Sequence, residues 1–211
     1  MKLTKYQHAC FSLEQDNQLL VVDPGNWSTD FIVTNNIVAV FISHEHGDHF
    51  DTNLISAIFD KNPNVLIISD QDILNQISLA TAKKPVVAGD TLGIGPFSLE
   101  FFGGQHATIR PSLPPIANLG VMINNLVYYP GDSFVAPNKP VDTLLLPISA
   151  PWLKFSETTE FLSTIEPRLA CPTHDAILSS EGVGLYDRMI MEVAEQVNTK
   201  YRRITGTSIQ I

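Results

Sequence analysis

Three of the six histidines in this 211-residue chain lie in one hexapeptide, His44–His49, whose pattern is H-x-H-x-D-H. The hexapeptide follows Ile37–Ile42, an apolar run typical of a strand buried on both faces. Apolar residues within 54–59 then recur at helical spacing, so the hexapeptide occupies a strand-to-helix loop. In open α/β folds, loops of this kind gather the ligands of the site. This placement constrains the fold more than any other feature.

The spacing inside the hexapeptide suits metal ligands. His44 and His46 are two residues apart on an extended segment, so they point to the same side and can bind one ion together. The small Gly47 allows a sharp turn, after which Asp48 and His49 face a second ion from the start of the helix. Imidazole and carboxylate groups suit zinc and similar divalent ions.

Metal sites of this type need further ligands from distant segments, and the chain offers three. Each lies within about four residues of the end of a predicted strand, a distance that keeps it at the strand end. They are His106 after the strand at 97–102, Asp132 after 126–129 and His174 after 169–171. This regular placement predicts that they join the same site.

Hydropathy patterning predicts an α/β fold. Strands are predicted at 2–6, 10–13, 19–22, 37–42, 65–68, 86–88, 91–94, 97–102, 119–123, 126–129, 143–146, 169–171 and 207–211. Helices are predicted around 54–59, 73–77, 161–165 and 185–197. Residues 103–117 are rich in Gly and Pro and are expected to form a loop. Strands alternate with helices in both halves without a linker, so one domain over 1–211 is expected.

Charge and composition narrow the partners. The chain has 13 basic and 22 acidic residues, a net charge of −9, which disfavours nucleic acid and anionic membranes. Its apolar runs are far shorter than the ~20 residues that span a bilayer, and the N-terminus lacks the apolar core of a signal peptide. Cys10 and Cys171 indicate buried thiols. A cytoplasmic protein with a small-molecule substrate is expected, and the sequence does not predict its oligomeric state.

Together these residues resemble the metallo-β-lactamase superfamily of hydrolases. The superfamily's series is an early Asp after a strand, the H-x-H-x-D-H motif, a later His, a bridging Asp and a last His. Here the series reads Asp23, His44–His49, His106, Asp132 and His174. Four segments resemble the L-ascorbate-6-phosphate lactonase-like branch of this superfamily, although Gln7 replaces the usual Gly. They are residues 7–11, 129–133, 146–148 and 172–175. The resemblance implies a four-layer αββα sandwich with the metals at one edge between the sheets.

The resemblance and metal chemistry also imply roles for the ligands. The first ion is expected on His44, His46 and His106, the second on Asp48, His49 and His174, with Asp132 bridging both. Two zinc ions are expected, although manganese or iron also suits such ligands. Asp48 is the expected catalytic residue, because its free oxygen would orient a hydroxide held by the ions. Asp23 would hold a ligand loop by hydrogen bonds; alternatively it is a turn residue at the end of a strand.

Four more residues are candidates for substrate binding: His8, Arg110, Trp152 and Lys154. In the branch that the chain resembles, His8 lies near the metal edge, where it would contact substrate or the neighbour of a metal ligand. A structural histidine in the core is the alternative. A guanidinium at Arg110 would pair with a phosphate or carboxylate. Plain surface placement is the alternative for Arg110, Trp152 and Lys154.

The expected function is divalent-metal-dependent hydrolysis, in which a metal-bound hydroxide attacks a small ester, lactone or phosphodiester bond. A different class remains open: a metal-binding or redox-linked protein of the same fold without hydrolase activity. A nuclease is a further alternative, which the short acidic chain disfavours.

Overall fold

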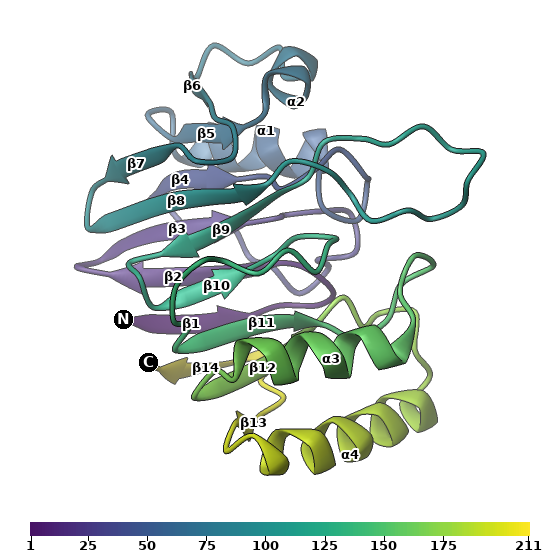
Figure 1. Cartoon of the computed structure of the whole chain (residues 1–211). Coiled ribbons are helices and arrows are strands. Elements are labelled where there is room, and N and C mark those ends of the chain that lie inside the picture. The colour runs from purple at the N-terminus through teal and green to yellow at the C-terminus, as the bar shows by residue number, and fades with distance from the viewer.

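Two seven-stranded sheets pack face to face in the computed structural model, which describes residues 1–211 (Figure 1). The first sheet contains, in spatial order, β14 (Thr207–Gln210), β1 (Lys2–Lys5), β2 (Phe11–Gln15), β3 (Gln18–Val22), β4 (Ile37–Phe41), β5 (Leu66–Ser69) and β6 (Ala82–Pro85). The second contains β13 (Lys200–Tyr201), β12 (Leu169–Thr173), β11 (Thr143–Pro147), β10 (Val127–Tyr129), β9 (Leu119–Ile123), β8 (Phe97–Gly103) and β7 (Thr91–Ile94).

Three apolar clusters separate four layers. The largest lies between the sheets and includes Phe41 from the first sheet and Phe101 from the second. Another joins the first sheet to α1 (Thr52–Lys61) and α2 (Gln71–Gln76), and the third joins the second sheet to α3 (Phe155–Ile165) and α4 (Ser180–Gln196). Each sheet therefore buries both faces, which explains the continuous apolar runs of its central strands. The arrangement confirms the predicted αββα sandwich (Figure 1).

Two hairpins were predictable from their turn residues. Asp16 and Asn17 join β2 to β3, and Asn124 and Asn125 join β9 to β10. All four have φ between 51° and 59°. Two consecutive residues with positive φ form the turn that matches strand twist, and Asn and Asp tolerate this conformation better than most residues.

The strand predicted at 86–88 was wrong. The strand in this region is β6, at Ala82–Pro85, which pairs in parallel with β5 at the edge of the first sheet. All four of its residues are exposed, and two are lysines. Polar residues and a proline are tolerated on an edge strand, so hydropathy does not reveal it. The two-residue strand β13 also lacks any pattern in the sequence.

One edge of the sandwich collects the loops that carry the candidate ligands. β1, β3 and β4 run in the same direction in the first sheet, as do β8, β10, β11 and β12 in the second. Their carboxyl ends lie toward the right of Figure 1, where the long β8–β9 loop protrudes.

No helix is long and apolar enough to cross a membrane.

Candidate metal centre

All seven predicted metal ligands meet at this edge. Two groups of four residues have ligand atoms within 4.8 Å of one another, and a third such group consists of Asp23, His44 and His49. The first consists of His44, His46, His106 and Asp132, and the second of His8, Asp48, His49 and His174. The first group contains the three histidines expected on the first ion, and the second contains the three ligands expected on the second ion. The second group also includes His8, which was not expected to be a ligand.

Asp132 lies between the two groups. Its Oδ2 is 3.3 Å from His106 Nε2 and 3.1 Å from His174 Nε2, and its Oδ1 is 3.3 Å from His49 Nε2. One carboxylate thus faces imidazoles of both groups. Trp152 also holds this carboxylate, because the indole Nε1 donates to Oδ2 at 2.7 Å.

The histidine tautomers are set by hydrogen bonds on the outer side of each ring. The Nδ1 of His106 donates to the carbonyl of Ala107 at 2.5 Å, and the Nδ1 of His174 donates to the carbonyl of Ser149 at 2.6 Å. In His49, Nδ1 donates to Asp23 at 2.8 Å. In each of these rings Nδ1 therefore carries the proton, and Nε2 can offer a lone pair to the centre.

His44 follows the same rule through a hydroxyl. Ser43 Oγ donates to Asp23 Oδ2 at 2.6 Å, so this oxygen accepts the proton of His44 Nδ1 at 3.0 Å.

The inward atoms fit a metal. Nε2 of His44, His49, His106 and His174 and Oδ1 of Asp132 are buried and have no hydrogen-bond partner. Buried polar atoms are rarely left unpaired, since each costs about 1–3 kcal/mol. Divalent cations would satisfy all of these atoms together, whereas unpaired burial of five would be strongly unfavourable.

Electrostatics agree with this assignment. Burial and the neighbouring imidazoles hold the pKa of His44 well below its usual range, so the ring is neutral. Burial disfavours ionisation of Asp132, but the imidazoles of His49, His174 and His44 outweigh it and hold the pKa of this carboxyl well below its usual range. A neutral imidazole and an ionised carboxylate are the forms that bind metal.

Asp23 is the buried anchor of the ligand loop. Its Oδ1 accepts the backbone N–H of Ser43 at 2.7 Å. Its Oδ2 accepts the Tyr129 hydroxyl at 2.7 Å, in addition to the bonds from Ser43 Oγ and His49. These contacts connect both sheets to the loop that carries four of the candidate ligands, His44, His46, Asp48 and His49. Sequence reasoning gave no role to Ser43 or Tyr129, although Ser43 directly precedes the H-x-H-x-D-H motif and Tyr129 begins the segment at 129–133.

His8 contacts Asp48 and does not line the cavity at the centre. Its Nδ1 accepts the backbone N–H of Ala176 at 3.3 Å, so Nε2 holds the proton and donates to Asp48 Oδ2 at 2.9 Å. A protonated Nε2 cannot bind a metal, which separates His8 from the other members of its group. His8 is thus fully buried and hydrogen-bonded to Asp48, a candidate ligand.

The backbone of His8 is held by distant segments. Its carbonyl accepts hydrogen bonds from the Lys5 ammonium, from Thr173 Oγ1 (2.9 Å) and from the N–H of His174 (3.1 Å). Lys5 is fully buried, and burial lowers its pKa to about 8. No pattern in the sequence pointed to this lysine.

Three residues at the centre have left-handed backbones: His8 (φ 57°), Asp23 (φ 47°) and His174 (φ 59°). Outside glycine this conformation costs about 1–3 kcal/mol, and such strain concentrates at functional sites. The surrounding hydrogen bonds of His8 and Asp23 hold both residues in place.

A cavity of about 430 Å³ opens over the centre, and we call it the site cavity. Candidate metal ligands form its floor, and its walls include Trp27, Ile109, Pro151, Trp152 and Ile177. Neither Arg110 nor Lys154 lines it; both are exposed, and Lys154 directly precedes α3. The structure therefore brings Trp152 to the centre and leaves the two basic candidates outside the cavity.

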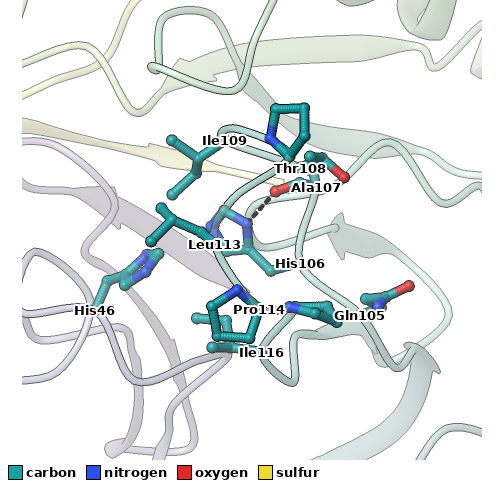
Figure 2. Close-up of a pocket in the computed structure, with 11 residues that line it drawn as sticks. His46, Gln105, His106, Ala107, Thr108, Ile109, Leu113, Pro114 and Ile116 are labelled. Carbon is teal, nitrogen blue, oxygen red and sulfur yellow. Dashed lines mark hydrogen bonds between the residues drawn. The ribbon is translucent and has the colours of Figure 1, made fainter.

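A second cavity, of about 450 Å³, lies under the β8–β9 loop, and we call it the loop cavity (Figure 2). It shares His46, His106 and Ile109 with the site cavity. In Figure 2, His46 approaches from the early part of the chain and His106 from the β8–β9 loop.

Comparison with known proteins agrees with this geometry. Residues 2–174 match the family described as beta-lactamase superfamily domain. Protein Rv0786c of Mycobacterium tuberculosis is 31% identical over 92% of each chain. A UPF0173 metal-dependent hydrolase of Desulforamulus reducens is 24% identical over 82% of this chain and 84% of its own. The metallo-beta-lactamase fold protein YhfI of Bacillus subtilis superposes with a TM-score of 0.75 at 14% identity, covering 99% of this chain and 98% of its own. The chain therefore belongs to the beta-lactamase superfamily domain family and has the metallo-β-lactamase fold.

Proposed function

We propose that this protein is a hydrolase that uses two divalent ions, with zinc as the expected metal, to cleave a small ester, lactone or phosphodiester bond. The observation that carries the proposal is the convergence of unpartnered Nε2 atoms from four histidines on the Asp132 carboxylate. The names of relatives support it, since one is a metal-dependent hydrolase.

The ligands would divide between two ions. His44, His46 and His106 would hold one, and Asp48, His49 and His174 the other, with Asp132 between them. When bound, such ions acidify a water molecule and polarise the bond to be cleaved.

Asp48 is the residue placed to orient the attacking water. Burial disfavours its ionisation, but His8, His49 and His174 outweigh this effect and hold the pKa of Asp48 well below its usual range. The carboxylate is therefore an acceptor near neutral pH, and it lines the site cavity. The N–H of His8 fixes its Oδ2.

The lining of the site cavity would leave recognition of an anion to the bound ions. It contains Asp48 and Asp132 but no lysine or arginine. A phosphate or carboxylate that reaches beyond the ions would therefore lack a cationic side chain to pair with, whereas an uncharged ester or lactone needs none.

Metal analysis joined to a substrate screen tests the proposal. The purified protein should contain up to two zinc ions per chain and hydrolyse members of a panel of lactones, carboxylic esters, thioesters and phosphodiesters. Chelation should abolish turnover and zinc should restore it, while Asp132→Ala should lose both metal and activity. A zinc-loaded protein inactive on the whole panel would contradict the proposal. Iron together with oxidase activity would favour the redox-linked alternative.

A further inference from the structure

The loop cavity is built almost entirely from one segment. All of its lining residues except His46 belong to 105–116, within the connection from β8 to β9 (Figure 2). It meets the site cavity at His46 and His106, two of the ligands proposed for the first ion. A molecule whose reactive bond lies over the metal centre could therefore extend directly into it.

The lining contains no acidic side chain, lysine or arginine, and its only polar side chains besides these two histidines are those of Gln105 and Thr108. Ile109, Leu113 and Ile116 supply the large apolar side chains, and prolines from 111–115 complete the wall. Arg110, although it lies in the same loop, is absent from the lining. Leu113 is 40% exposed, so a large apolar surface stays in contact with water unless a ligand covers it.

Backbone hydrogen bonds hold the base of the loop. The N–H of Gly104 donates to Asn118 at 2.8 Å, that of His106 to Ile116 at 3.0 Å and that of Ala107 to Asp132 at 2.9 Å. Prolines further restrict the backbone of its tip. A preformed wall spares the ligand the entropy of ordering a loop, which favours affinity.

We propose that the loop cavity binds an uncharged, apolar group of the substrate, an alkyl or aryl chain attached to the bond that is cleaved. The proposal rests on the hydrolase function given above and specifies its substrate class. Charge complementarity supports it: no lysine or arginine lines either cavity, so an anionic group that extends past the ions into the loop cavity would find no cationic side chain to pair with, and the net charge of −9 adds no attraction.

Binding of alkyl hydroxamates to the zinc-loaded protein tests the proposal without turnover. The hydroxamate group chelates zinc, and the chains compared are acetyl, butanoyl, hexanoyl and octanoyl. Each methylene that enters the cavity should tighten Kd by roughly fourfold, until the cavity is filled. A hydroxamate whose alkyl chain has similar length but ends in a carboxylate should gain much less affinity. Calorimetry measures each Kd.

Leu113→Ala and Leu185→Ala form a matched pair. Leu113 lines the loop cavity and Leu185 lies on α4, outside it, and they are 40% and 43% exposed. Leu113→Ala should weaken octanohydroxamate by roughly 5- to 20-fold and leave acetohydroxamate unchanged, since only the long chain reaches the lost side chain. Leu185→Ala should change neither, and thermal melting should show both variants folded.

Two outcomes would overturn the apolar subsite: a Kd in the parent protein that does not depend on chain length, or equal behaviour of the two variants. Failure of octanohydroxamate to bind counts as the first. Length-dependent binding in a protein that cleaves no ester would uphold the subsite and reject the hydrolase. Ester hydrolysis that is indifferent to chain length and to Leu113→Ala would reject the subsite alone.

Discussion

Single protons decide which side chains at this centre can bind metal. His8 and His174 are packed against one another, with ring centroids 4.0 Å apart, yet their hydrogen bonds give them opposite tautomers. His174 donates through Nδ1 and leaves Nε2 free, whereas His8 accepts at Nδ1 and donates through Nε2 to Asp48. Two histidines in one cluster thus have different roles.

Replacing His8 should weaken one ion selectively. His8→Ala removes the donor that orients Asp48, and loss of such an outer partner typically costs 10–100-fold in metal affinity. We expect this loss for the second ion only, because His44, His46 and His106 do not contact His8. Equilibrium dialysis against buffered zinc measures both affinities. His8→Gln, which retains an N–H donor, should recover part of the loss; equal weakening of both ions would contradict the role.

The pH dependence of metal binding should follow His49. Burial lowers the pKa of this imidazole, but Asp132, Asp23 and Asp48 outweigh burial and raise it to about 9. In the metal-free protein His49 is therefore protonated at pH 7, and an ion must displace that proton. The apparent affinity for the second ion should fall by up to tenfold for each unit that the pH drops below about 9.

Calorimetry in two buffers of different ionisation enthalpy checks this expectation. At pH 7 the second ion should release about one proton more than a site built from neutral imidazoles. An affinity that is the same at pH 7 and pH 9 would show that His49 is neutral without metal.

At the scale of elements, the centre depends on close contact between two loops. The loop after β3 crosses the loop after β4, where the N–H of Asn26 donates to the carbonyl of Gly47 at 2.8 Å. A Cβ on Gly25 would lie 2.0 Å from the backbone carbon and oxygen of Asp48 and 2.4 Å from the nitrogen of His49. The glycine that the site needs is Gly25. Gly47, which the sequence suggested for a sharp turn, does not have a positive φ.

Alanine at these two glycines should therefore have unequal effects. Gly25→Ala must displace the backbone of two ligands, so we expect a loss of about 2–3 kcal/mol in stability together with loss of the second ion. In Gly47→Ala the new Cβ would approach only the Asn26 side chain, at 3.1 Å, which can move. Urea unfolding and zinc stoichiometry measure both effects. Similar values for the two variants would show that the loops separate easily.

At the scale of the molecule, the centre joins the two sheets. His44 and His49 follow β4 in the first sheet, whereas His106, Asp132 and His174 follow strands of the second. Bound ions would link these halves at the edge of the shared core. Ligands that bind only the folded state stabilise it by mass action.

Removal of metal should consequently lower the melting temperature. At a free zinc concentration of about 1,000 times Kd, one site contributes about 4 kcal/mol, which corresponds to roughly 8–16 °C in a chain of this size. Scanning calorimetry with zinc and with a chelator measures the shift. His106→Ala should show a smaller difference, and identical melting with and without chelator would contradict a metal that links the sheets.

The sequence by itself predicted the candidate ligands, because their information is local. A two-residue spacing on an extended segment and a position just beyond an apolar strand are visible in the chain. The resemblance of these residues to a known superfamily then implied the αββα fold. The polar edge strand β6 escaped this reasoning because edge strands need no apolar pattern.

Only the tertiary structure decided how those ligands are held and what lies over them. The bond from Thr173 to the carbonyl of His8 spans 165 positions, and that from Tyr129 to Asp23 spans 106. The tautomer of His8, the need for Gly25 and the exclusion of Arg110 from both cavities arise in the same way. Each depends on which backbone or side chain arrives from a distant segment, and a hydrogen bond or a steric contact of that kind leaves no periodic trace in the sequence.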